Sequence, residues 1–415
     1  MGRYKVRVLI VSQYFWPEEF RINEVCKTLI EKGIQVDVLT GKPNYPEGKI
    51  FAGYQLSGCQ LEHYCGANIS RVPLFPRGRN SGFRLALNYL SFIVFGLTSG
   101  PWLKRRRKYD VIFVYGLSPI IQALPALFLG WLKRVPVVIW VQDLWPQSLS
   151  ATGYVRNRFV LSFMEHVVKF IYRHADLLLV QSQAFIEPVR ALSFSTPVRY
   201  YPNSVDDSFA LPPKEQMLDI LGLEGRFSVV FAGNIGTAQG VEVIVEAAAL
   251  LKEHKDIQFV VLGDGSCRQW MLQQVAVRKL TNLHLPGRFP VKKMPSFMQK
   301  ASALLVTLTN REIYAMTVPN KVQAYLAAGR PIIACLPGEG AKLVVEARAG
   351  VAVKAEDGKA LAEAVLGLYK MSESARDEMG RHGRAYFYQH YDHERLVDQL
   401  IDELRGVVEN KESIQ

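Results

Sequence analysis

The chain has 415 residues, of which 49% are hydrophobic and 21% are charged, and its formal net charge is +12. This length predicts two or three domains, and the composition excludes a disordered or fibrous chain. The apolar run at residues 8–11 is too short for a secretory signal, and five scattered cysteines form no Cys-x-x-Cys pair. We therefore expect a cytoplasmic protein with reduced thiols.

The positive charge belongs to the first half of the chain. Residues 1–203 hold 25 Lys and Arg against 12 Asp and Glu, whereas the remainder holds 25 against 26. A net charge of +13 on one half and −1 on the other predicts that one domain faces an anionic partner.

Short apolar runs alternate with helical patterns along the first half. A helix is predicted at 22–32, where Gly33 ends it. The predicted strands lie at 6–11, 36–39, 111–114, 135–141 and 177–180. Continuous apolar strands separated by helices are typical of parallel sheets that are buried on both faces.

Within this half, residues 71–109 combine cations with a long uncharged run. The run at 85–103 predicts a helix with a wide apolar face, although Gly96, Gly100 and Pro101 disfavour a membrane-spanning helix. The cations next to the run are Arg84, Lys104, Arg105, Arg106, Arg107 and Lys108. Such a helix can lie on an anionic leaflet, where each nearby cation contributes about 1 kcal/mol.

Two alternatives remain for this segment, a buried helix beside a solvated basic loop and a nucleic-acid surface. No zinc-finger or RNA-recognition signature supports nucleic acid. We expect peripheral contact with an anionic membrane surface and no nucleic-acid partner.

Two loops in the first half carry polar residues that suit a binding site. Asp143 ends an apolar strand, where it either caps a following helix or acts as an active-site acid. The loop at 13–23 contains Tyr14, Arg21 and Asn23, which either contact a bound sugar or pack within the loop.

The alternation of strands and helices resumes after a proline-bearing stretch at 200–213. A helix is predicted at 240–254, and the predicted strands lie at 229–232, 259–262, 283–285, 303–308, 331–334 and 350–353. The sequence thus predicts two doubly wound Rossmann-like α/β domains, 1–203 and 204–385, with ligands in the cleft between them. Residues 386–415 are expected to form a terminal helix that packs back on the first domain.

Two turns of the second domain are suited to a phosphate. Gly233 to Gly240 follow a strand in a Gly-x-x-Gly pattern, which differs from the dinucleotide-binding pattern. Arg288 follows a third strand, where its side chain can reach a phosphate while neighbouring backbone atoms hold a base.

The most informative helix start lies at residues 319–321. Pro319 and Asn320 are N-terminal helix signals, and Gly329 followed by Pro331 ends the helix. Free N–H groups, the positive end of the helix dipole and Lys321 together suit a diphosphate without a metal. His390 and His393 could suggest a metal site, but no third ligand cluster lies near them in sequence, which favours a solvated tail helix.

Taken together, these motifs resemble the family 4 glycosyltransferases of GT-B fold. The similarity is greatest to the bacterial fucosamine- and colanic-acid-type enzymes of surface polysaccharide synthesis. The segments that carry it are 14–18, 43–46, 142–146, 201–203, 233–240 and 319–331. The resemblance implies a retaining transfer from a nucleoside diphosphate sugar, with UDP and an N-acetylated deoxysugar as the expected donor.

The resemblance also implies the acceptor and the place of the enzyme. The acceptor would be a lipid-linked saccharide of O-antigen or lipopolysaccharide synthesis, bound by the N-terminal domain through Tyr14, Arg21 and Asn23. The enzyme would be peripheral on the inner face of the bacterial plasma membrane. Asp143 and Lys321 are expected to be catalytic, with no cofactor and no metal ion.

The donor would lie in the C-terminal domain, with its base against Arg288 and Phe289. The implied donor-binding residues are Asn234, Gly236, Gln239, Arg288, Phe289, Pro319, Asn320 and Lys321. Leaving-group charge would be stabilised by the helix dipole and cations.

This chain departs from the family pattern at several positions. Two family glutamates, eight positions apart, are replaced by Met316 and Ala324, and a strand-end histidine is replaced by Gln142. Asn234 and Gln239 stand in place of a basic pair. The missing glutamates leave two alternatives, a nucleotide-sugar epimerase of the same architecture and a non-catalytic subunit of a polysaccharide assembly.

Overall fold

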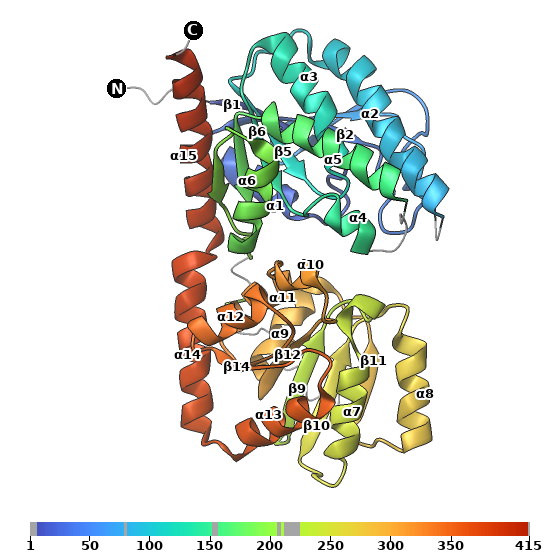
Figure 1. Ribbon diagram of the computed structural model, residues 1–415, viewed down its shortest axis with the longest axis vertical. Coiled ribbons are helices and arrows are strands. Elements are labelled where there is room, and N and C mark those ends of the chain that lie inside the picture. Colours follow the sequence, from blue (N-terminus) through green and yellow to red (C-terminus); the bar gives the residue numbers. More distant parts are fainter. Residues whose placement is uncertain (1–5, 79–80, 152–156, 206–208, 211–224, 414–415) are drawn as a thin grey trace. The chain divides into compact units, whose positions relative to one another are not determined.

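The computed structural model describes residues 6–78, 81–151, 157–205, 209–210 and 225–413. The chain forms two compact units (Figure 1). Unit 1 comprises Met1–Pro202 together with Glu394–Gln415, and unit 2 comprises Asn203–His393. Each unit is an α/β fold built on a parallel sheet, as the alternation of apolar runs and helices predicts.

The sheet of unit 1 has eight strands in the order β3-β4-β2-β1-β5-β6-β7-β8. All neighbours are parallel except β3, which pairs with β4 in the antiparallel sense. The strands are β1 (Arg7–Val11), β2 (Gln35–Gly41), β3 (Gln60–Tyr64), β4 (Ala67–Val72), β5 (Val111–Gly116), β6 (Val137–Val141), β7 (Leu177–Val180) and β8 (Val198–Tyr200).

Helices cover both faces of this sheet. They are α1 (Arg21–Glu31), α2 (Gly82–Lys104), α3 (Leu124–Lys133), α4 (Gln147–Ala151), α5 (Arg158–Arg173), α6 (Ile186–Ser193) and α15 (His393–Glu412). Apolar side chains of α1 and α15 share one buried cluster with alternate residues of the central strands. Helices α2, α3 and α5 all pack against the short 3-10 helix η1 (Ile120–Ala123), and α2 also packs on β2 and β4.

The sheet of unit 2 has six parallel strands in the order β11-β10-β9-β12-β13-β14. The strands are β9 (Phe227–Ala232), β10 (Ile257–Leu262), β11 (Leu283–Gly287), β12 (Ala303–Thr307), β13 (Ile332–Cys335) and β14 (Gly350–Val353). The strand order reverses between β9 and β12, and the crevice at such a point is where open α/β sheets bind ligands.

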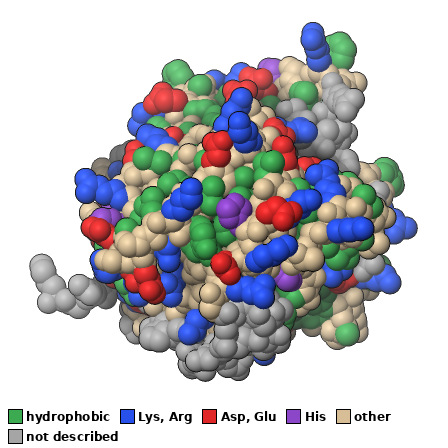
Figure 2. Space-filling view, turned by 90° about the horizontal axis from the view of Figure 1, so that it is seen from below, with side chains coloured by type: hydrophobic (Ala, Val, Ile, Leu, Met, Phe, Trp, Pro, Cys, Tyr) green, Lys and Arg blue, Asp and Glu red, His purple; other side chains and the backbone are tan. Residues whose placement is uncertain are grey.

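The helices of unit 2 follow the same alternation. They are α7 (Glu242–Leu250), α8 (Arg268–Arg278), α9 (Met294–Lys300), α10 (Glu312–Ala315), α11 (Asn320–Ala328), α12 (Glu339–Glu346), α13 (Gly358–Lys370) and α14 (Glu373–His390). Figure 2 shows a face of the protein on which acidic and basic side chains are interspersed, without a large patch of either sign.

Every strand expected from the sequence is present, because each is a short apolar run, and most of these runs are buried in a sheet. Strands β3, β4 and β8 were not expected, since polar residues interrupt their apolar pattern. Residues 386–415, expected as one terminal helix, divide between α14 in unit 2 and α15, whose residues from Glu394 belong to unit 1.

Helix α2 is long and apolar enough to cross a membrane by length and composition alone. One side of it is nevertheless packed within unit 1, where Asn88, Ser91 and Phe92 are buried. A side chain at Gly96 would lie 2.7 Å from Pro125, so close packing there requires glycine. The opposite side exposes Phe83, Leu90 and Val94.

Lys104 does not belong to the exposed cations of this segment, which corrects the sequence-based expectation. Its side chain is 2% exposed, and Nζ donates a hydrogen bond to the Val38 carbonyl at 3.2 Å and lies 3.8 Å from Asp37. Burial lowers the pKa of Lys104 to about 8, and the Asp37 carboxylate opposes that shift. Arg84 and residues 105–108 are exposed.

Candidate functional site

The glycine-rich turn of unit 2 begins where β9 ends at the switch in strand order. Gly233 has φ +140° and Gly240 has φ +56°, conformations that favour glycine. A Cβ atom at Gly233 would lie 2.5 Å from Lys321 Cε. Glycine at this position therefore makes room for the lysine of a different element.

Lys321 extends from the first turn of α11 towards that loop. Its Nζ donates a hydrogen bond to Gln239 Oε1 at 2.6 Å and lies 3.8 Å from the centre of the Phe231 ring. Burial lowers the pKa of Lys321 to about 7, far below its ordinary value. The amine thus lies in a partly desolvated position in which an anionic ligand would favour its charged form.

Hydrogen bonds to two other segments of unit 2 hold α11 in place. Pro319 precedes the helix, and no side chain caps the N–H groups of the first turn. Asn320 Oδ1 accepts a hydrogen bond from Asn203 Nδ2 at 3.1 Å. One turn after Lys321, the buried Tyr325 hydroxyl accepts a hydrogen bond from the Ala232 N–H at 3.0 Å. This tyrosine ties α11 to the end of β9.

A cavity of about 320 Å³ lies beside the glycine loop, a size suited to a small ligand. It is lined by Gly233, Asn234, Leu262, Gly263, Asp264, Arg288, Phe289, Val291 and Met294. The structure thus brings Asn234, Arg288 and Phe289 together, as a shared ligand site requires. Gly236 lies next to Asn234, because a Cβ on it would be 2.7 Å from Asn234 Nδ2. Asp264 and Met294 were not expected here.

A larger cavity, of about 630 Å³, lies at the other end of α11 and includes none of the expected donor-binding residues. Arg384 donates hydrogen bonds there to the Ala327 and Ala328 carbonyls at 3.3 and 2.9 Å, which satisfies the end of the helix. Arg330 lies 3.5 Å from Asp377. These arginines serve the fold, so we place the candidate site at the start of α11.

The replaced family glutamates have no acidic counterpart at their own positions. Ala324 is buried in the core of unit 2, and Met316 ends the short helix α10. Among the described residues, no cluster of three or more His, Cys, Asp or Glu has the grouping of a metal site. His393 instead forms a hydrogen bond through Nδ1 with Ser204 Oγ at 2.8 Å.

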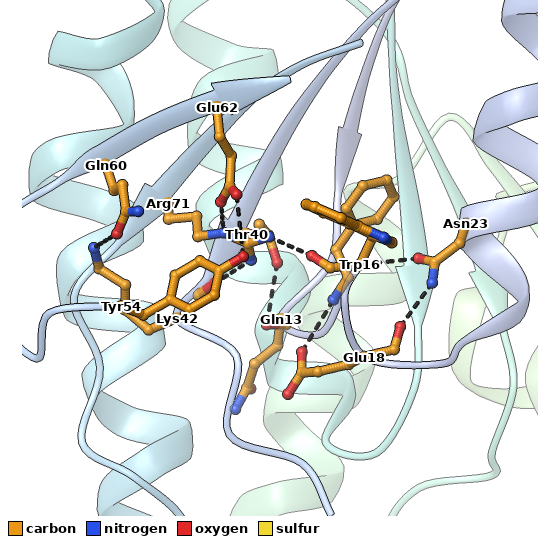
Figure 3. A network of polar contacts seen from close by, with 12 residues as sticks. Gln13, Trp16, Glu18, Asn23, Thr40, Lys42, Tyr54, Gln60, Glu62 and Arg71 are labelled. Atoms are coloured by element: carbon orange, nitrogen blue, oxygen red, sulfur yellow. Dashed lines mark hydrogen bonds and ion pairs between the residues drawn. The ribbon is translucent and has the colours of Figure 1, made fainter. Parts of the chain in front are cut away.

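In unit 1, the loop after β1 is held by its own polar residues (Figure 3). Asn23 Oδ1 accepts a hydrogen bond from the Trp16 N–H at 3.0 Å, and Asn23 Nδ2 donates to the Glu18 carbonyl at 2.7 Å. Tyr14 is 3% exposed, and its ring packs against Phe20. Tyr14 and Asn23 therefore order the loop, and their direct contact with an acceptor stays a prediction.

Arg21 is the remaining expected acceptor residue. Its side chain is 18% exposed and lies 3.4 Å from Glu24. Two other cations behind the loop were not expected. Arg71 is fully buried against Glu62 and the Gly41 and Trp16 carbonyls, and Lys42 donates to Gln60 Oε1 at 2.9 Å. Burial, with Arg71 nearby, lowers the pKa of Lys42.

Glu18 joins this loop to the loop after β2. Its Oε1 accepts hydrogen bonds from the backbone N–H groups of Asn44 and Tyr45 at 2.8 and 2.7 Å, and its Oε2 accepts one from the Phe15 N–H at 3.3 Å. The side chain is 1% exposed, and burial raises its pKa to about 7 despite these bonds. Glu18 thus sets the relative position of two loops at the carboxyl ends of β1 and β2.

Asp143 follows β6 and faces the loop after β5. Its Oδ2 accepts hydrogen bonds from Ser118 Oγ at 2.8 Å and from the Ser118 N–H at 3.2 Å. Trp145 Nε1 donates to the same Ser118 hydroxyl at 2.9 Å. Burial raises the pKa of Asp143, and the bonds from Ser118 oppose that shift. The carboxyl group therefore holds an adjacent loop.

Two family models match most of the chain. The Glycosyl transferase 4-like domain matches residues 19–204, and Glycosyl transferases group 1 matches residues 226–371. The chain is 25% identical to the "Probable glycosyltransferase WbjE" of Pseudomonas aeruginosa, over 56% of this chain and 58% of that protein. It is 23% identical to the "Putative colanic acid biosynthesis glycosyl transferase WcaI" of Escherichia coli, over 97% of this chain and 100% of that protein.

Solved structures share the fold. Sucrose-phosphate synthase from Thermosynechococcus elongatus superposes with a TM-score of 0.77 at 16% identity, covering 97% of this chain and 99% of that chain. Anabaena HepE, solved in complex with UDP, superposes with a TM-score of 0.72 at 14% identity, covering 97% and 100%. These neighbours support the GT-B architecture of two parallel-sheet α/β units.

The raised pKa of Glu18 predicts a pH-dependent stability of unit 1. Because the folded pKa of about 7 exceeds the unfolded value, the folded state binds more protons between about pH 4.5 and 7, and stability falls as pH rises through this range. Between pH 5 and pH 8, urea unfolding should show that the free energy of unfolding of wild type falls by about 2–3 kcal/mol more than that of Glu18→Gln. The exposed Glu19→Gln serves as control, and equal pH dependence in all three proteins would contradict the assignment.

Proposed function

Because the chain belongs to the glycosyltransferases built from a 4-like domain and a group 1 domain, we propose that it transfers a sugar, with retention, from UDP to a lipid-linked saccharide. The acceptor belongs to bacterial surface polysaccharide synthesis, a proposal supported by the WcaI relative, which is named for colanic acid biosynthesis. Both matching family models describe glycosyltransferases. We therefore set aside the two alternative functions, a nucleotide-sugar epimerase and a non-catalytic subunit.

The donor belongs to unit 2, and the observation that carries this assignment is the position of Lys321 against the glycine loop. The Lys321 amine lies against Gly233 and Gln239 of the loop, close to the first turn of α11, which its N-cap residue Pro319 leaves without a side-chain cap. A cation and the start of a helix both favour an anion, and the cavity beside the loop suits a base and sugar. UDP is favoured because HepE, of the same fold, is solved with UDP and with UDP-glucose.

Within this site the diphosphate lies between Gly236, Arg288, Lys321 and the start of α11, and the base lies against Arg288 and Phe289. Asn234, Gln239, Pro319 and Asn320 complete the donor site. As the bond between the sugar and the diphosphate breaks, negative charge grows on the leaving UDP. The Lys321 amine and the dipole of α11 stabilise that charge without a metal ion or cofactor.

The acceptor belongs to unit 1. Arg21 is the cation of the β1 loop that remains accessible, and Glu18 and Asn23 hold that loop in place. Asp143 acts on the acceptor hydroxyl, because burial raises the pKa of its carboxyl group and so makes it a better proton acceptor.

Unit 1 also contacts the inner face of the plasma membrane, where a lipid-linked acceptor is located. The cations Arg84, Arg105, Arg106, Arg107 and Lys108 lie at the two ends of α2, whose outer side exposes Phe83, Leu90 and Val94. Cations around an apolar helix side suit an anionic leaflet.

Transfer itself tests the proposal. The protein is incubated with UDP-, GDP- and dTDP-sugars and an undecaprenyl-diphosphate-linked saccharide, with and without EDTA. We expect product from a UDP-sugar at the same rate in EDTA, and an unchanged anomeric configuration in its NMR spectrum. Absence of product with all three nucleotide classes would contradict the proposed activity, and inversion would contradict retention.

Removing the Lys321 amine should weaken donor binding, because a charge-assisted partner of the diphosphate is lost. Calorimetry should show that Lys321→Ala raises the dissociation constant for UDP about 10- to 150-fold, which corresponds to roughly 1.5–3 kcal/mol. Lys342→Ala, at an exposed lysine of the same unit, is the matched control.

The pH dependence gives a second readout for the same variant. The free amine loses its proton near pH 7 and regains it beside the diphosphate, so wild type should bind a UDP-sugar less tightly as pH rises above 7. Lys321→Ala should lack this loss of affinity. An unchanged dissociation constant, or an identical pH profile, would remove Lys321 from the site.

A further inference from the structure

Helix α5 of unit 1 exposes a stripe of phenylalanine side chains. Phe159, Phe163 and Phe170 are 86%, 65% and 50% exposed. Their spacing of four and seven residues places all three on one side of the helix. An isolated exposed phenylalanine is ordinary, whereas an aligned set indicates a surface that is covered by something else.

The packing of α5 explains why this stripe is exposed among the residues of unit 1 that the structure describes. Its buried residues are Val168, Ile171 and Tyr172, all in the second half of the helix. In the first half, residues 158–160, 162 and 163 are exposed. A helix of a soluble protein normally turns its apolar side to the core, but α5 is apolar on both its buried and its exposed side.

Cations lie along one flank of the stripe. Arg158 begins the helix and Arg173 ends it, and the single acidic residue of α5, Glu165, lies 2.6 Å from Lys169. The Arg173 guanidinium lies 5.8 Å from the ring centre of Phe194, which is 84% exposed after α6. Exposed aromatic side chains flanked by cations are the chemistry of a helix that lies in the interface of an anionic bilayer.

Neighbouring helices also expose aromatic side chains. Trp131 of α3 is 74% exposed and Trp102 of α2 is 60% exposed. Helices α2, α3 and α5 all pack against η1, and in Figure 1 they lie away from α15. Exposed apolar side chains thus occur on three helices of unit 1 that share one packing partner.

We propose that α5 inserts its phenylalanine stripe into an anionic leaflet and forms a second membrane contact beside α2. This rests on the proposed function only in that a lipid-linked acceptor places the enzyme at a membrane. A second copy of the chain fits this surface less well, because two strongly cationic units would repel each other. Two helices that contact one plane fix the orientation of unit 1, which a single helix would leave free to rotate about its axis.

Vesicle binding tests the proposal with the double variant Phe159→Ser/Phe163→Ser. The control is Val277→Ser, a 77% exposed apolar residue of α8 in unit 2. We measure co-sedimentation with vesicles of equal parts phosphatidylglycerol and phosphatidylcholine, without acceptor or donor. The double variant should lose about tenfold or more in partition coefficient, because two side chains no longer leave water. Val277→Ser and the conservative Phe163→Trp should bind like wild type.

Three outcomes would overturn the proposal. They are wild-type partitioning by the double variant, no vesicle binding by wild type, and a wild-type dimer in solution that the double variant converts to a monomer. UDP-sugar transfer to a short water-soluble acceptor, measured without vesicles, should be equal in both proteins. Absence of transfer by every protein would count against the proposed function. If all proteins transfer sugar but wild type does not bind vesicles, only the membrane contact is contradicted.

Discussion

The contact of Lys321 with the loop after β9 is the interaction on which the proposed chemistry depends. A lysine in the first turn of α11 crosses to a different element, lies over the Phe231 ring and reaches Gln239. Space for it exists because residue 233 is glycine. Tyr325 holds the same helix to β9, so the amine, the loop and the helix dipole are fixed together before any ligand arrives.

In unit 1, buried polar side chains hold the loops in place. Glu18 binds the backbone of two loops, and Arg71 ties β4 to the Gly41 and Trp16 carbonyls. Burying charges costs free energy unless each finds partners, and here the partners are backbone atoms at the carboxyl ends of neighbouring strands. The two units thus supply a fixed anion site and a fixed loop surface.

Local patterns predicted all strands except β3, β4 and β8, the helix start at Pro319 and the exposed apolar side of α2, because each depends on neighbouring residues. Long-range pairs were not predictable in this way. In the sequence, Lys104 is one of five adjacent cations. In the structure it is buried near Asp37, a residue that lies far from it in the sequence. Tyr14 and Asn23 suit a sugar site by residue type, whereas in the structure Asn23 bonds to the backbone of its own loop and Tyr14 donates a hydrogen bond to Asn88 of α2. The aligned phenylalanines of α5 were visible in the sequence, but only the structure shows that they are exposed.

The missing family glutamates place more of the donor interaction on Lys321 and its surroundings. Ala324 is buried in the core and offers no polar group, so in the proposed site recognition of the nucleotide falls to the start of α11 and the adjacent cavity. A crystal structure of the complex with UDP tests this account most directly. We predict diphosphate oxygens about 3 Å from Lys321 Nζ and the uracil against Phe289. A nucleotide bound elsewhere, with Lys321 still bonded to Gln239, would contradict the account.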